Sequence, residues 1–198
     1  MLAKGGVKWI LYSFFPAIVA RLISRQYWWT LLSLPFAAAL FYRDPDRDTP
    51  ESGVVSPADG RVSVIEEEDS RVRIGVFMNV TDVHVNRSPV TGVVESNRHV
   101  PGGHLPAFTK SSERNERQVT EISAEEGDFR VVQIAGTVAR RITSYLNDGE
   151  GIDRGDRIGL IAFGSRADVL LPERYGMDDV DVDFGEKVYG GETVIAKD

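Results

Sequence analysis

Hydrophobic and polar residues follow two different patterns in this chain, and the pattern changes near residue 43. Two apolar stretches come first, at 7–24 and 27–42, and each contains one proline. A helix needs about 20 apolar residues to span a membrane, so each stretch is slightly short. Their aromatic residues and the flanking Lys and Arg side chains suit a membrane interface. The pattern predicts a helical hairpin at 1–43 that spans the bilayer or inserts into one leaflet. The alternative is a pair of helices buried in a soluble core.

Short β-like runs dominate the chain after a polar, proline-bearing linker at 43–53. Val, Ile and Thr are frequent in these runs, and Gly or Pro interrupts them at short spacing, as in strands and turns. The runs lie at 53–67, 71–78, 92–100, 118–123, 129–142, 157–163, 167–172 and 192–197. Helical periodicity is nearly absent. We therefore expect a mainly β domain at 44–198, arranged as a sandwich or a barrel-like sheet pair.

The tail at 185–196, GEKVYGGETVIA, has the glycine and valine spacing of hammerhead-type β domains. Biotinyl and lipoyl carriers use such a tail beside a hairpin that presents a modified lysine. Here no lysine occupies a tight hairpin tip, so a carrier is only a distant alternative. The tail predicts hammerhead-like elements within the β domain.

Composition and charge narrow the classes of function. The chain has 198 residues, of which 42% are hydrophobic and 27% charged, which is a globular balance. The absence of cysteine excludes disulfides, thiol catalysis and zinc–thiolate sites. Residues 1–50 carry six basic and three acidic side chains, whereas the remaining 148 carry 17 and 27. An acidic body argues against a nucleic-acid partner, which would need a basic face.

Three positions could carry chemistry, although each has an ordinary structural explanation by itself. Gly164–Ser165 lies between two apolar runs, where a turn is the default reading. Asp59 lies in SPADG, a turn that aspartate readily forms. His84 lies in NVTDVHVNRSPVTG, between an apolar strand and a Ser-Pro turn. The three dispersed histidines of the chain do not supply the ligand cluster of a metallopeptidase, so we expect no metal site.

Taken together and in order, these motifs are more specific. SPADG, the His84 turn, VPGG at 100–103, ERNER at 113–117 and FGS at 163–165 follow an apolar N-terminus. This arrangement resembles the phosphatidylserine decarboxylase family, and most closely its short archaeal-type branch, whose members act on phosphatidylserine or archaetidylserine. The resemblance runs from about Arg43 to Ala196.

The resemblance implies a proenzyme that cuts itself between Gly164 and Ser165. The products would be a large chain, 1–164, and a small chain, 165–198, that stay associated. The family converts the serine into an N-terminal pyruvoyl group, which forms a Schiff base with the amine of the serine headgroup and accepts electrons when carbon dioxide leaves. The implied reaction is decarboxylation to the ethanolamine lipid, and no external cofactor is expected.

Serine is a weak nucleophile until a base takes its proton, and a histidine oriented by an aspartate is a common base. Asp59, His84 and Ser165 could form such a triad if the fold brings them together. One departure from the family pattern is Arg87, which stands where many members have a second histidine. Two alternatives follow: His84 serves both cleavage and decarboxylation, or Arg87 takes a charge-stabilising part, because arginine cannot act as a base.

The phosphate of a lipid needs hydrogen-bond donors. Arg114 and Arg117 in ERNER, with Lys110 just before them, are the candidates, and the alternative is a solvated charged loop. We expect a phospholipid substrate, attachment to the cell membrane, and a catalytic domain on the cytoplasmic side. A homodimer is an open possibility. The competing hypothesis is a membrane-anchored, non-catalytic β-sandwich binding or assembly module, in which Ser165 stays intact.

Overall fold

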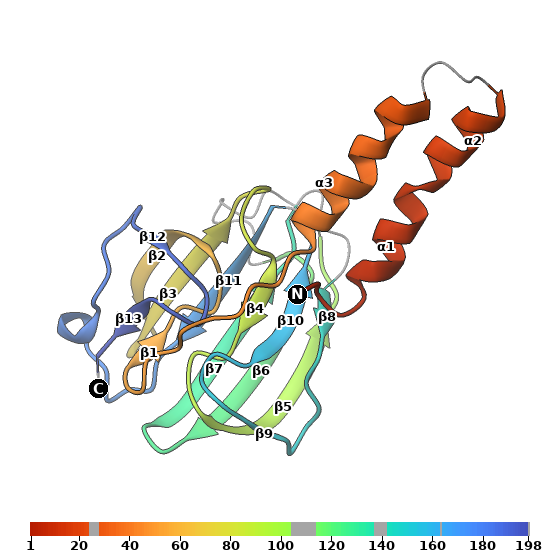
Figure 1. Ribbon diagram of the computed structural model, residues 1–198. Helices are drawn as coiled ribbons and strands as arrows, with labels where there is room; N and C mark the ends of the chain where they lie inside the picture. Colours follow the sequence, from red (N-terminus) through yellow and green to blue (C-terminus); the bar gives the residue numbers. More distant parts are fainter. Residues whose placement is uncertain (24–27, 104–113, 137–141, 163, 198) are drawn as a thin grey trace. The chain divides into compact units, whose positions relative to one another are not determined.

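A computed structural model describes residues 1–23, 28–103, 114–136, 142–162 and 164–197. The chain divides into two compact units, Met1–Asp46 and Arg47–Asp198 (Figure 1). The regular elements of the first unit are helices, and those described in the second unit are strands except for one short 3₁₀ helix.

The first unit is an antiparallel helical hairpin. Its elements are α1 (Gly6–Ser13), α2 (Phe15–Ile23), the 3₁₀ helix η1 (Trp28–Leu32) and α3 (Ser33–Phe41). The base of the hairpin is closed by backbone hydrogen bonds, from Ala3 N–H to the Tyr42 carbonyl and from Asp44 N–H to the Met1 carbonyl, both 2.9 Å. Gly6 is required there because a Cβ at this position would lie 2.7 Å from Tyr42 Cβ.

The hairpin presents apolar side chains outward. The residues Gly6–Ile23 form one helical stretch of 18 residues that is long and apolar enough to cross a membrane. Large apolar side chains are exposed along the hairpin: Val7, Trp9, Leu11, Tyr12, Phe14, Phe15, Ile18, Leu22, Ile23, Trp29, Leu32, Leu34, Phe36 and Leu40. A soluble core would bury these side chains, so this surface is suited to anchoring in a membrane.

The second unit contains one large sheet and two small ones. The strands are β1 (Val54–Val55), β2 (Gly60–Glu68), β3 (Arg71–Met78), β4 (Val85–Arg87), β5 (Gly92–Val100), β6 (Arg117–Ala124), β7 (Gly127–Ile134), β8 (Ile142–Ser144), β9 (Gly151–Ile152), β10 (Arg157–Ile161), β11 (Ser165–Leu170), β12 (Lys187–Val188) and β13 (Val194–Ala196). A short 3₁₀ helix, η3 (Met177–Asp179), lies in the tail.

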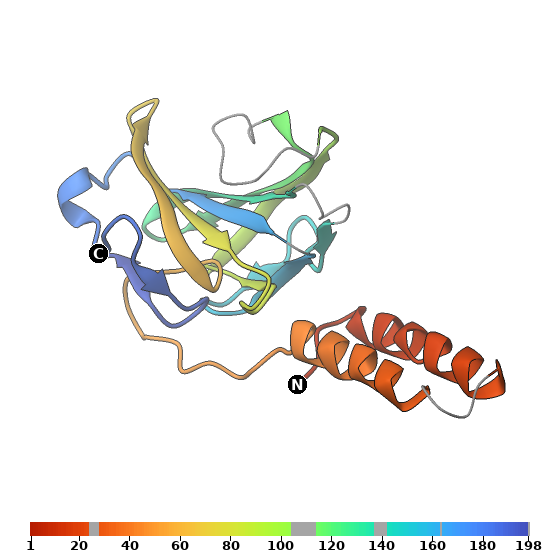
Figure 2. The ribbon, with the colours of Figure 1, turned by 90° about the horizontal axis from the view of Figure 1, so that it is seen from above.

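The large sheet has the order β12-β2-β3-β11-β7-β6-β5-β9, and its paired strands are antiparallel. Figure 2 shows how this sheet curls. The small sheets are β4-β10-β8 and β1-β13. Within the large sheet, β11 is central: it pairs with β3 on one side and with β7 on the other. The strand that begins at Ser165 is therefore held on both edges.

The two faces of β11 have different chemistry because successive side chains of a strand alternate. Ala167 and Val169 join the apolar core, which the large sheet shares with residues of the small sheets. On the opposite face Asp168 is fully buried and is held by Arg73 and Arg166. Its carboxylate oxygens lie 2.6–2.9 Å from the guanidinium nitrogens of both arginines.

The expected fold class is confirmed: the protein is mainly β, with a curled sheet in the unit that follows the N-terminal helical hairpin in the sequence. The run at 129–142 is divided, because β7 ends at Ile134 and β8 starts at Ile142, with 137–141 outside the described residues. The tail supplies β12 and β13, which pair with β2 and β1.

Candidate functional site

Ser165 is a strand residue rather than part of a turn. It opens β11, opposite Met78 of β3, and it is completely buried. Its hydroxyl lies 3.9 Å from the Met78 sulfur, a weak hydrogen bond. The core-facing position of Met78 places this contact on the core side of the large sheet. The serine is thus shielded from water, which is a favourable setting for chemistry on the preceding peptide bond.

Gly164 bends the chain immediately before this strand. Its φ angle is +59°, in the left-handed region, and nothing lies within 4 Å of the place where a Cβ would stand. Backbone conformation, not lack of space, therefore demands glycine here.

We expect Gly164→Ala to lower the free energy of unfolding by roughly 1–2 kcal/mol, the cost of a left-handed non-glycine residue. Urea unfolding would measure this loss in a Ser165→Ala background, in which every variant stays a single chain. Gly151→Ala is the matched control, since Gly151 also has open space around it but an ordinary φ. Equal urea midpoints for the two variants would show that the backbone at position 164 does not require glycine.

His84 lies at the start of a segment that is hydrogen-bonded to the strand leading to Gly164. Its carbonyl accepts a hydrogen bond from Ile161 N–H at 3.3 Å, and Val85 pairs with Leu160. Two residues on, Asn86 Nδ2 lies 3.5 Å from the same Met78 sulfur that the Ser165 hydroxyl contacts. These contacts bring the His84 segment and the serine into one buried neighbourhood.

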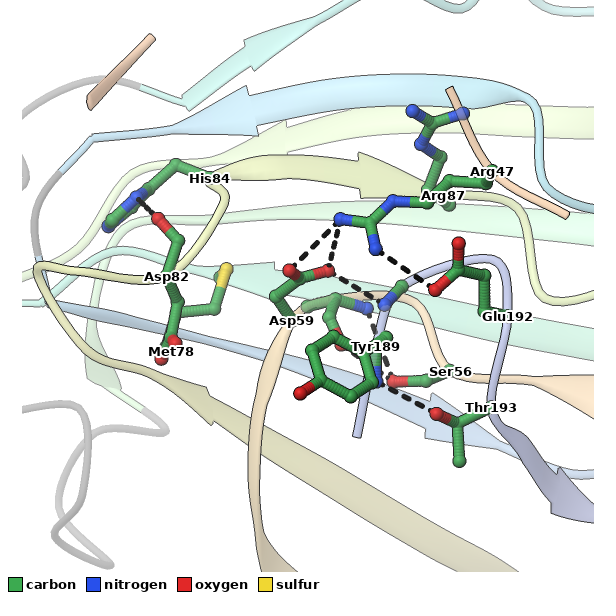
Figure 3. Close-up of polar contacts among 12 residues, drawn as sticks. Arg47, Ser56, Asp59, Met78, Asp82, His84, Arg87, Tyr189, Glu192 and Thr193 are labelled. Carbon is green, nitrogen blue, oxygen red and sulfur yellow. Dashed lines mark hydrogen bonds and ion pairs between the residues drawn. The ribbon is translucent and has the colours of Figure 1, made fainter. Parts of the chain in front are cut away.

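The imidazole of His84 is fully buried, and its Nδ1 lies 2.9 Å from the backbone carbonyl oxygen of Asp82 (Figure 3). A carbonyl oxygen can only accept, so Nδ1 carries the proton. In the neutral ring Nε2 is then the unprotonated nitrogen, which is the form a general base requires.

Asp59 lies in a bend directly before β2 and is engaged by other groups. Both of its carboxylate oxygens accept hydrogen bonds from Arg47 Nη2, at 2.9 and 3.0 Å, and one of them also accepts from Gly190 N–H at 2.8 Å (Figure 3). Arg47 donates in addition to Glu192 at 3.2 Å. This cluster joins the linker, the SPADG turn and the tail.

The predicted triad is not connected by hydrogen bonds in this arrangement. Among the described residues, neither Asp59 nor Ser165 is hydrogen-bonded to His84. A rotation of the serine side chain away from Met78 is needed before its proton can pass to a base. The orienting partner of the histidine ring is a backbone carbonyl rather than the Asp59 carboxylate.

The arginine candidates lie in different surroundings. Arg87 is buried, and its guanidinium donates to the Gly155 carbonyl at 3.0 Å. Arg114 is exposed, while Lys110 lies outside the described residues. Arg117 is on β6, where it lines a cleft of about 540 Å³ on the sheet face opposite the core.

Four arginines, one glutamate and five apolar residues line this cleft. The charged residues are Arg73, Arg98, Arg117, Arg130 and Glu68, which pairs with Arg73, and the apolar residues are Val100, Val119, Val132, Ile134 and Leu170. Ile134 pairs with both Arg117 and Arg166, so the cleft reaches the row of side chains directly after Ser165. Guanidinium groups above an apolar surface suit an anionic amphiphile.

Three polar residues of this part of the protein, Asn86, Gln133 and Arg47, were not predicted as site residues from the sequence. Gln133 Nε2 donates to Asn86 Oδ1 at 2.8 Å, and both side chains are buried. In the sequence, Arg47 resembles an ordinary solvent-exposed charge of the polar linker. A buried amide in a strand is a departure from apolar alternation, and that departure is the sole hint that Gln133 gives in advance.

Comparisons with known proteins match nearly the whole chain to a single family. The family model for phosphatidylserine decarboxylase matches residues 36–196. A putative archaetidylserine decarboxylase proenzyme of Halobacterium salinarum is 51% identical, with all of both chains covered. A phosphatidylserine decarboxylase proenzyme of Streptomyces avermitilis is 44% identical, covering all of this chain and 94% of its own length. A putative archaetidylserine decarboxylase proenzyme of Methanococcoides burtonii is 45% identical, covering 100% and 96%.

These matches include the bend at Gly164, the buried Ser165 and the His84 segment within one aligned length. The resemblance seen in the ordered motifs is confirmed, and the chain belongs to the phosphatidylserine decarboxylase family of carboxy-lyases.

Proposed function

We propose that this protein is a self-processing, pyruvoyl-dependent decarboxylase of a serine phospholipid, with phosphatidylserine or archaetidylserine as substrate. The observation that carries the proposal is the junction at Gly164–Ser165. A left-handed glycine with open space precedes a fully buried serine that opens the central strand of the large sheet. The names of the relatives, all of them proenzymes of this class, support the same reaction.

The proposed cleavage begins with the hydroxyl of Ser165. Nε2 of His84 takes the hydroxyl proton, and the oxygen attacks the carbonyl carbon of Gly164. The bond from that carbon to the Ser165 nitrogen breaks, which turns the amide into an ester. Removal of the Cα proton of Ser165 then breaks its Cβ–O bond and frees Gly164 as a carboxylate. The remaining dehydroalanine takes up water and loses ammonia, leaving a pyruvoyl end.

Asp59 is proposed to support the histidine as the third member of the triad. Its two hydrogen bonds from Arg47 hold the carboxylate in place. A local shift of the SPADG bend is required before it can face His84.

The pyruvoyl group supplies the electron sink for decarboxylation. Position 165 fits this group, because it is enclosed on the core side by Met78 and followed by a strand held on both edges. After cleavage the buried His84 remains beside it as the group that can hold or deliver a proton. Arg87, at the position of the family's second histidine, is proposed to stabilise charge. Its guanidinium is held by the hydrogen bond that it donates to the Gly155 carbonyl.

The substrate is a membrane lipid, and the hairpin is proposed to anchor the enzyme in the same membrane. Its exposed apolar side chains would lie among acyl chains, with the catalytic unit on the cytoplasmic side. Arg117 and the cleft it lines are proposed to contact the lipid phosphate, with Arg114 as a more exposed contributor.

The test of this function is release of carbon dioxide from a lipid labelled in the serine carboxyl group. The purified full chain would be mixed with vesicles of phosphatidylserine and, separately, of archaetidylserine. Release from either lipid, with loss of activity after borohydride reduction in the presence of substrate, supports the proposal. An intact Ser165 and no release from either lipid would favour a non-catalytic binding module.

We expect Arg117→Gln to raise KM for the lipid about tenfold, since a charge-assisted hydrogen bond contributes about 1.5–3 kcal/mol. Self-cleavage should proceed as before, because Arg117 lines the sheet face opposite the core, whereas the Ser165 hydroxyl contacts Met78 on the core side. Steady-state kinetics with vesicles would measure the change, and Arg61→Gln is the control: Arg61 donates to the Gly185 carbonyl, outside the cleft. Equal KM values for both variants would remove Arg117 from the lipid site.

A further inference from the structure

Asp82 links His84 to the tail of the chain through two different groups. Its backbone carbonyl accepts from His84 Nδ1 at 2.9 Å, and its carboxylate receives Lys187 Nζ at 2.6 Å. The second carboxylate oxygen accepts from Asn79 N–H at 2.8 Å, while Asp82 N–H donates to the Asn79 carbonyl at 3.0 Å. Two hydrogen bonds between Asp82 and Asn79, one donated by each residue, therefore hold the turn that presents this carbonyl.

Lys187 is well placed to hold this turn. It belongs to β12 and pairs with Arg61 of β2, so its backbone is fixed by the large sheet. Its side chain is 33% exposed and that of Asp82 is 14% exposed, which makes the pair better shielded than a typical surface ion pair. The ammonium also lies 5.6 Å from the centre of the Tyr189 ring.

We infer that Lys187 is a positioning residue for His84. By fixing Asp82, it keeps the carbonyl oxygen against Nδ1, and that contact sets both the orientation of the ring and the tautomer in which Nε2 is unprotonated. The inference rests on the proposed function in giving His84 the part of the base. The tautomer itself is a property of the folded chain, whether or not the chain cuts itself.

The position of Lys187 in the sequence adds a second consequence. Lys187 follows Ser165, whereas Asp82 and His84 precede it, so the ion pair would join the small chain to the large chain after cleavage. The same tail reaches the other proposed acid–base residue, because Gly190 N–H donates to Asp59 (Figure 3). Residues 187–190 thus contact the surroundings of both His84 and Asp59.

The experiment is ¹⁵N NMR of the imidazole nitrogens in full-length Ser165→Ala protein, which has only three histidines to assign. We expect His84 to show a protonated Nδ1 and an unprotonated Nε2. Lys187→Met should convert this signal into a mixture of tautomers, and Asp82→Asn, which keeps the carbonyl but loses the charge, should do the same. Lys187→Arg should restore the single tautomer.

Self-cleavage gives the second readout, in chains that retain Ser165. Lys187→Met should slow cleavage roughly 10- to 100-fold, the scale expected when a catalytic group is misplaced by about 1 Å, and Lys187→Arg should recover most of the rate. Lys197→Met is the matched control, since it removes a lysine–aspartate pair with Asp181 elsewhere in the tail.

An unchanged tautomer in Lys187→Met would overturn the inference, even if that variant were less stable. A chain that never cuts itself, with the tautomer still dependent on Lys187, would refute the proposed cleavage and leave the positioning role supported. The two failures are therefore distinguishable.

Discussion

A Ser165→Ala variant should remain a single uncut chain, whereas the natural sequence should yield two chains separated at Gly164. The reason is chemical: alanine has no hydroxyl to attack the preceding carbonyl, so the loss of cleavage should be complete rather than partial. Intact mass under denaturing conditions measures it directly. The small chain should have the mass of a pyruvoyl end at position 165 and no free amino terminus.

The variant should fold as the natural chain does, because the lost hydroxyl has one weak contact, to Met78. Ser123→Ala is the control: Ser123 also lies in a strand and its hydroxyl bonds to Asp128, far along the chain from the junction. It should be cut like the natural sequence. One uncut chain from all three proteins, purified from membranes in folded form, would refute self-processing.

Asp168→Asn should strongly destabilise the β unit. Asp168 is fully buried and accepts four hydrogen bonds from Arg73 and Arg166. Without its charge, two buried guanidinium groups lose their common partner, and breaking a buried pair in this way costs about 3–5 kcal/mol. Urea unfolding in the Ser165→Ala background would measure the loss as a lower midpoint.

The control is Asp181→Asn, which breaks the more exposed pair with Lys197 and should change the midpoint little. Gly75 offers an independent check on the same site, because a Cβ there would lie 2.7 Å from an Asp168 carboxylate oxygen. Gly75→Ala should therefore also destabilise the protein. A midpoint for Asp168→Asn equal to that of the Asp181 control would mean that the buried charges are compensated by other groups.

Local patterns in the sequence were sufficient for the fold class and for most strands. Val- and Ile-rich runs bounded by Gly and Pro predicted β3 and β5 at the residues where they occur, since strand propensity and turn chemistry agree there. The apolar N-terminus likewise predicted the hairpin. These features depend on residues close together in the chain.

The site could be predicted only in part, because its contacts join distant segments. Gly164–Ser165 has the composition of a turn, yet Ser165 opens a strand because β3 and β7 pair with it on both edges. The SPADG motif identified Asp59 as a candidate. No residue near Asp59 in the sequence predicts its hydrogen bond from Gly190 N–H, 131 positions away. The roles of Asp82 and Lys187 were likewise hidden, since an aspartate in a turn and a lysine in a polar tail are both commonplace.

The central place of β11 determines the order of events when this protein is made. Residues 165–198 supply β11 in the middle of the large sheet, β12 at its edge and β13 of the small β1-β13 sheet, and the bend at Gly164 leads directly into a strand that β3 and β7 hold on both edges. Folding must therefore come before the proposed cut, and a misfolded chain would stay inert. Once the chain is cut, β11 would no longer be covalently joined to the preceding residues. Refolding would then require the separate large and small chains to associate. After maturation, the survival of the folded protein would depend on its rate of unfolding rather than on a reversible folding equilibrium.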